Sequence, residues 1–92
     1  MRDTTEHLAA ARIKVEKWRT EGNSEQLAES LEGLASVLLK EVDLVGAASA
    51  LEEAAGLWSD MSSVERQGSC LLLAASSHRL AGDLDGAKHT LN

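Results

Sequence analysis

Apolar residues recur along this chain at intervals of three and four positions, with polar residues between them. That spacing places the apolar side chains on one stripe of an α-helix. In the first segment the stripe consists of Leu8, Ala11, Val15 and Trp18. The polar segment 21–23 interrupts the pattern, so we predict a first helix from about residue 4 to residue 20, with Asp3 as its cap.

Four further segments continue the helical spacing. A second helix is predicted from its cap Ser24 to residue 41, and a third from its cap Asp43 to residue 58. A fourth is predicted over 62–81 and a fifth from residue 84, because Gly82 readily adopts the positive φ that ends a helix. The inner stripes are Leu27, Leu31, Leu34, Leu38 and Val42 in the second helix, Leu44, Ala47, Leu51, Ala54 and Ala55 in the third, and Val64, Leu71, Ala74 and Ala75 in the fourth. The chain is therefore expected to be all-α, with about five helices.

Part of the sequence repeats after forty positions. The segment 43–51 reads DLVGAASAL and returns at 83–91 as DLDGAKHTL. The same shift aligns identical residues upstream, namely Glu25 with Glu65, Leu31 with Leu71, Ala35 with Ala75, Ser36 with Ser76, and Trp18 with Trp58. Recurring helical units are typical of repeat proteins, which more often bind other proteins than catalyse reactions.

Composition narrows the class of protein further. A length of 92 residues fits one small domain, and the absence of proline favours helices. The net charge of −6 argues against a nucleic-acid partner, because phosphate contacts need clustered Lys and Arg. The longest apolar run, 71–75, is too short to span a membrane, and the polar start lacks the apolar core of a signal peptide. We therefore expect no membrane partner and, by default, a cytoplasmic location.

The residues that could carry chemistry are few and dispersed. The single cysteine, Cys70, cannot form an internal disulfide, and it lies two helical turns, about 12 Å, from His78. That distance is too long for one zinc ion, and His89 would add only one more ligand. The glycines form no phosphate-binding loop. No catalytic residue, metal site or cofactor is predicted.

Residues 25–91 resemble a tetratricopeptide repeat protein. The first copy reads Leu31-x-x-Leu34-Ala35-x-x-Leu38, then Asp43-Leu44-x-x-Ala47-x-x-x-Leu51-x-x-Ala54; the second reads Leu71-x-x-Ala74-Ala75-x-x-His78, then Gly82-Asp83-Leu84-x-x-Ala87-x-x-x-Leu91. The unit here is 40 residues rather than about 34, the family's proline is missing, and Leu and His replace its large aromatic residues. The resemblance implies a single domain that is an α-solenoid of antiparallel helix hairpins, with a half unit over 1–23, one repeat over 24–63 and an incomplete repeat over 64–92.

The resemblance also implies a groove that binds a protein or peptide. Its positions here are Glu29, Glu32, Ser36, Leu39 and Lys40 in one unit and Ser69, Leu72, Ser76, Arg79 and Leu80 in the next. Members that bind chaperone tails hold a C-terminal carboxylate with Lys and Asn, whereas Glu32 and Ser36 stand at those places, so that ligand is not expected. The acidic group of Glu25, Glu29 and Glu32 would favour a basic or neutral peptide; alternatively it is a solvated helix face.

Two further features each have a structural and a functional interpretation. Trp18 and Trp58 could fill gaps between hairpins, which their matching register favours, or contact a bound peptide. The last helix would leave an exposed end face at Leu84, Ala87 and Leu91. The chain could be a fragment of a longer solenoid, it could self-associate through this end, or the end could fray.

The favoured hypothesis is a protein-interaction scaffold that presents a groove and an end face. The first alternative is a regulatory module that binds a short peptide within a longer protein. The second is a small enzyme subunit, for which the sequence offers no catalytic pair. An enzyme should show ionisable groups that converge in a deep pocket, whereas an interaction module should show an open groove.

Overall fold

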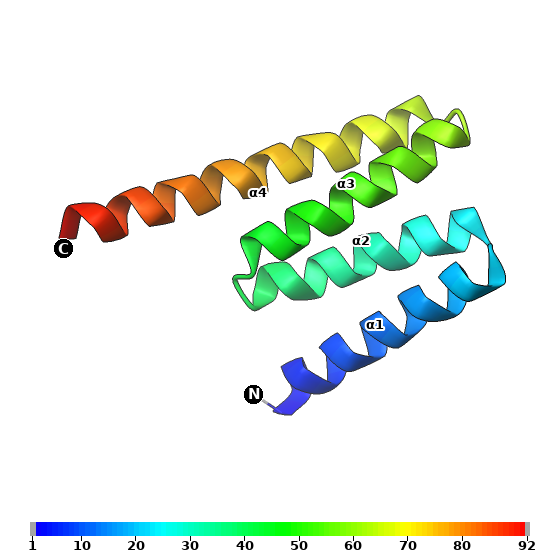
Figure 1. Cartoon of the computed structure of the whole chain (residues 1–92), viewed down its shortest axis with the longest axis horizontal. Coiled ribbons are helices and arrows are strands. Elements are labelled where there is room, and N and C mark those ends of the chain that lie inside the picture. Colours follow the sequence, from blue (N-terminus) through cyan, green and yellow to red (C-terminus); the bar gives the residue numbers. More distant parts are fainter. Residues whose placement is uncertain (1, 92) are drawn as a thin grey trace.

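The computed structural model describes the backbone of residues 2–91 and the side chains of residues 5–85. Within that range it contains four helices and no strand, which confirms the all-α prediction. The helices are α1 (Arg2–Glu21), α2 (Ser24–Lys40), α3 (Leu44–Asp60) and α4 (Val64–Leu91). Each helix runs antiparallel to the one before it, and each packs mainly against its neighbours in the sequence (Figure 1). None of the described helices has the length and apolar character that a membrane crossing requires.

The turns between the helices share one local geometry. The residues Gly22, Val42 and Ser62 have positive φ angles of 71°, 60° and 61°, and they lie twenty positions apart. At the end of α2, the Val42 N–H donates to the Leu39 carbonyl at 3.0 Å and the Asp43 N–H donates to the Leu38 carbonyl at 2.9 Å. These bonds satisfy carbonyls that the helix end leaves free. Val42 therefore leaves the predicted inner stripe and is exposed.

The residue after each of the first two turns caps the following helix. The Gly46 N–H donates to the Asp43 side chain at 3.0 Å, which confirms the predicted cap of α3. For α2 the cap is Asn23 and not Ser24, because the Gln26 N–H donates to the Asn23 Oδ1 at 3.1 Å. Ser24 is instead the first helical residue. The predicted cap was thus wrong by one position, because asparagine and serine are both common cap residues.

The core lies where α2 and α3 pack together. The four leucines of the predicted α2 stripe are buried, as is every residue predicted for the α3 stripe. Ala28, Ala47, Ala48 and Ala54 have no exposed surface. Small side chains at these positions let the two helix backbones approach closely, and the leucines fill the space beside them. The core cluster extends to Val15 of α1 and to Cys70 and Ala74 of α4.

The inner stripe of α4 differs from the prediction. Among residues 64–85 of α4, the buried ones are Cys70, Ala74 and Ser77. Of the predicted stripe only Ala74 is buried, whereas Val64, Leu71 and Ala75 are exposed. The forty-position shift thus aligns buried Leu31 with exposed Leu71. The physical reason is that α2 is covered on two sides, by α1 and α3, whereas α4 packs mainly against α3.

A separate fifth helix does not form within residues 2–91, because α4 continues through Gly82 and Asp83. The backbone of Gly82 lacks the positive φ found at the three turns. A helix over 84–91 would have only two turns, too few to be stable without packing, so continuing α4 keeps its hydrogen bonds at no cost of closing a turn. The result is the part of α4 that projects beyond α3 in Figure 1.

Ion pairs join helices that are not sequence neighbours. Arg19 of α1 pairs with Glu53 of α3 at 2.6 Å, and Arg66 of α4 pairs with Glu29 of α2 at 3.3 Å. Side chains of α1 and α3 therefore meet across α2, and side chains of α2 and α4 meet across α3. The four helices form an antiparallel array. Surface clefts lie between α1 and α2 and between α1 and α3.

Candidate functional site

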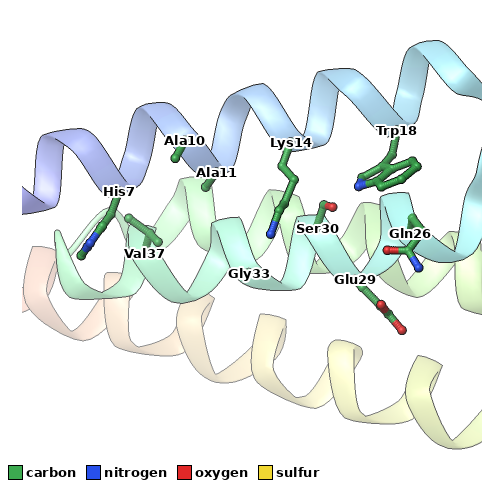
Figure 2. Close-up of a pocket in the computed structure, with 10 residues that line it drawn as sticks. All are labelled: His7, Ala10, Ala11, Lys14, Trp18, Gln26, Glu29, Ser30, Gly33 and Val37. Carbon is green, nitrogen blue, oxygen red and sulfur yellow. The ribbon is translucent and has the colours of Figure 1, made fainter.

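The larger described cleft runs along α1 and α2 and has a volume of about 610 Å³. Because the two helices are antiparallel, His7 and Val37 lie at one end of it and Trp18 and Gln26 lie at the other (Figure 2). His7 and Trp18 are eleven positions apart, which corresponds to a length of about 16 Å along α1. The cleft is therefore an elongated surface groove, which we call the α1–α2 cleft.

Small residues on both helices create this cleft. Ala10 and Ala11 line it from α1, and Ser30 and Gly33 line it from α2. A Cβ atom at Gly33 would meet no atom within 4 Å, so a side chain there would project into open space. Trp18 supplies the largest side chain and is half-buried against the core. The middle of the cleft thus has small residues on both walls, and an indole ring lies at one end.

Charged groups of both signs border the cleft. Lys14 lies on the α1 wall and Glu29 on the α2 wall. The Lys17 ammonium lies 4.7 Å from the centre of the Trp18 ring, a cation–π distance. Because Glu29 also pairs with Arg66, part of its charge is already balanced. The cleft therefore carries charges of both signs, one on each wall.

The second acidic residue of the predicted groove has a structural partner. The Trp58 Nε1–H donates to the Glu32 carboxylate at 2.7 Å, and the Arg66 guanidinium lies 4.4 Å from the centre of the Trp58 ring. Trp58 is buried, as the packing interpretation predicts. Cys70 is buried nearby, and that burial, together with the Glu32 carboxylate, raises the pKa of its thiol. This cluster joins α2, α3 and α4 and holds them together.

A second, smaller cleft of about 400 Å³ lies between α1 and α3, over α2. Its floor includes Leu31, Leu34 and Leu38, which belong to the core. The Arg19–Glu53 ion pair borders it, and the hydrogen bond to Glu53 raises the pKa of Arg19 further. The leucines of its floor pack in the core and the charges at its border are paired with each other. Fewer of its side chains are therefore available to contact a ligand than in the α1–α2 cleft.

The predicted groove residues do not gather in one cleft. Those of α2 lie on its exposed or half-exposed side, and only Glu29 lines the α1–α2 cleft. Those of α4 are exposed on the side away from α3: Ser69, Leu72, Ser76, Arg79 and Leu80. The predicted groove did not include α1, although Trp18 was considered as a peptide contact. The signal for α1 was the pair of adjacent alanines, Ala10 and Ala11, of which Ala11 belongs to the predicted stripe that contains Trp18.

The predicted end face is described only in part. Leu84 is 48% exposed, as that prediction requires. The side chains of Ala87 and Leu91 lie outside the described residues. Elsewhere, His78 contacts Glu52 across the α3–α4 interface at 3.2 Å, and both side chains are half-exposed. Within the described part of the chain, no three His, Cys, Asp or Glu side chains come together as metal ligands would.

Comparisons with protein-family models, with curated proteins and with solved structures found no match to this chain.

Proposed function

We propose that this protein is an interaction scaffold of the tetratricopeptide type, which binds a short peptide or helix in the α1–α2 cleft. The observation that carries this proposal is the cleft itself, an open groove with small residues on both walls, an indole ring at one end and charges of both signs. Peptide-binding sites combine these features, since the apolar walls supply binding energy and the polar groups fix orientation.

The arrangement of the helices supports the repeat interpretation. Successive antiparallel helices are joined by turns whose positive-φ residues lie twenty positions apart, so a helix hairpin occupies forty residues. Forty positions is also the shift at which the sequence repeats. An array of this kind holds its helices rigidly, so the cleft exists before a ligand arrives and binding requires little reorganisation.

The size of the cleft limits the ligand. A length of about 16 Å accommodates about five residues of extended peptide or about three turns of helix. The small walls at Ala11 and Gly33 leave space for one or two apolar side chains of the ligand. A basic residue of the ligand could pair with Glu29 and an acidic one with Lys14, which lie on opposite walls. The proposed ligand is therefore a short amphipathic segment with charges of both signs.

A substitution that fills the cleft tests the proposal. Peptides would first be selected from a displayed random library against the whole chain, and the affinity of a synthesised peptide would be measured by calorimetry. Gly33→Leu should weaken binding at least about tenfold, because its side chain would occupy the cleft. The same change should not unfold α2, because glycine is less favourable than leucine inside a helix.

The matched control is Gly56→Leu. Gly56 is also an exposed helical glycine with no atom within 4 Å of an added Cβ, but it does not line either cleft. It should leave peptide affinity unchanged, whereas Trp18→Ala should weaken it. If no peptide is selected, or if the selected peptide binds the Gly33→Leu variant as well as the original chain, the proposal fails.

A further inference from the structure

The side of α4 that faces away from α3 is unusually apolar. The exposed fractions are 76% for Val64, 46% for Leu71, 70% for Leu72, 51% for Leu73 and 49% for Leu80. The side that faces α3 is formed by the smaller residues Cys70, Ala74 and Ser77. A helix with large apolar residues on its solvent side normally packs against another surface there. We call this side the outer face of α4.

Two charged residues of the outer face, Glu65 and Arg79, are placed symmetrically about Leu72, and a third, Asp83, lies one turn beyond Arg79. Glu65 lies seven residues before Leu72, and Arg79 lies seven residues after it. Because seven residues make almost two full turns, these three side chains follow one line along the helix. Within the described side chains, neither Glu65 nor Arg79 forms an ion pair. From Glu65 to Arg79 the line therefore has opposite charges at its ends and an apolar centre.

Small residues have the same symmetry. Gly68 and Ser69 precede Leu72 by one turn, and Ala75 and Ser76 follow it by one turn. All four are exposed. In an antiparallel helix pair centred on Leu72, Gly68 of one helix would lie opposite Ser76 of the other, and Ser69 opposite Ala75. Small side chains at these crossing points would let the two helices approach closely.

We infer that the outer face of α4 is a self-complementary dimer interface, at which a second copy of this chain packs α4 against α4 in antiparallel orientation, centred on Leu72. A twofold axis then places Glu65 of each copy opposite Arg79 of the other, which gives two ion pairs, and Leu72 against Leu72. Leu71 and Leu73 cover the two sides of this contact.

Charge decides the orientation. A parallel pair in register would bring Glu65 beside Glu65 and Arg79 beside Arg79, and like charges at this distance repel. In the antiparallel arrangement Glu65 and Arg79 of each copy face a residue of opposite charge, so both contacts are attractive. The contact from Val64 to Leu80 extends over about 24 Å of helix, which is a short interface. The dimer is therefore a weak and reversible one that forms at high protein concentration.

A charge-exchange experiment tests this interface on the whole chain. Sedimentation velocity from about 10 μM to about 1 mM should show that the original chain dimerises as its concentration rises. Glu65→Arg alone should place two cations opposite each other at both ends of the contact, and Arg79→Glu alone should place two anions there. Each variant should weaken dimerisation by at least about tenfold. An equimolar mixture of the two variants should dimerise again, because every pair then contains one cation and one anion.

The controls separate this interface from general effects of charge and stability. Glu6→Arg changes the net charge by the same amount on α1, which has no substantial packing against α4, and should leave dimerisation unchanged. Leu72→Glu should abolish dimerisation without loss of helicity, because Leu72 is exposed in one copy. A chain that remains monomeric at every concentration overturns the inference, and so does a mixture of the two charge variants that fails to recover the dimer. These residues do not line the α1–α2 cleft, so the peptide-binding proposal stands or falls separately.

Discussion

Replacing Glu32 by alanine tests how much the Trp58–Glu32 hydrogen bond contributes to the fold. The indole N–H of Trp58 donates to the Glu32 carboxylate at 2.7 Å, and Trp58 is only 3% exposed. The Arg66 guanidinium covers the ring from α4. When the carboxylate is removed, the indole N–H keeps its buried position but loses its acceptor, and little water can reach it.

The size of the effect follows from this geometry. A buried donor without an acceptor costs about 1–3 kcal/mol, and a bond to a charged acceptor is at the stronger end of net hydrogen-bond contributions. We therefore expect Glu32→Ala to lower the free energy of unfolding by about 2 kcal/mol. For a domain of this size the unfolding entropy converts that loss into a fall of about 10 °C in Tm. Glu32→Gln keeps an acceptor and should lower Tm by less than half as much.

Thermal unfolding followed by circular dichroism would measure these differences. Glu29→Ala is the matched control, because Glu29 is on the same helix and pairs with the same Arg66, but in an exposed ion pair. Exposed pairs contribute about 0–1 kcal/mol, so this control should lower Tm by no more than about 5 °C. Equal effects of Glu32→Ala and Glu29→Ala would refute the reasoning, since burial of the indole N–H would then have no measurable consequence.

Four other predictions concern residues whose surroundings the structure defines. Cys70 is 1% exposed, so a thiol reagent should modify it at least about a hundredfold more slowly in the native protein than in denaturant; equal rates would contradict its burial. The pKa of this thiol is higher in the folded state than in the unfolded state. The free energy of unfolding should therefore not change with this group near neutral pH, but it should decrease as pH rises above about 8.5, the ordinary thiol pKa. Alkaline denaturation curves of Cys70→Ala should lack that decrease. Asp43→Ala removes the cap of α3 and should cost about 1 kcal/mol in urea unfolding. Gly56→Ala should add up to about 1 kcal/mol, whereas Gly46→Ala should give no such gain, because an added Cβ would meet the Asp43 carboxylate at 2.5 Å; equal gains at both glycines would contradict this clash.

Some of this fold follows from local sequence signals. The spacing of the leucines predicted the buried side of α2, and the position of Asp43 predicted the start of α3. These predictions succeed because helix caps and apolar periodicity act between residues a few positions apart. The same local reasoning failed at Gly82 and Asp83, where a good turn signal is present but the helix continues. A turn forms only when the segment beyond it can pack on something, and that condition is not local.

The candidate site was harder to predict for the same reason. Glu29 and Trp18 were singled out from the sequence, and both line the α1–α2 cleft. The predicted groove combined α2 with α4, however, whereas the cleft combines α2 with α1. Which flank of a helix faces a neighbour depends on how the helices cross. The spacing of residues within one helix does not determine that angle.

The sequence by itself determined that the chain is helical, where α2 and α3 lie, and which of their side chains enter the core, because period, caps and small residues act within each helix. Only the tertiary structure decided which side of α4 is buried. That helix has apolar residues on every side, so its own pattern favours no face. The small residues Cys70, Ala74 and Ser77 pack closest to α3, and the larger leucines are left on the outside. Burial on α4 was thus set by the partner helix, through the distance at which two backbones can approach.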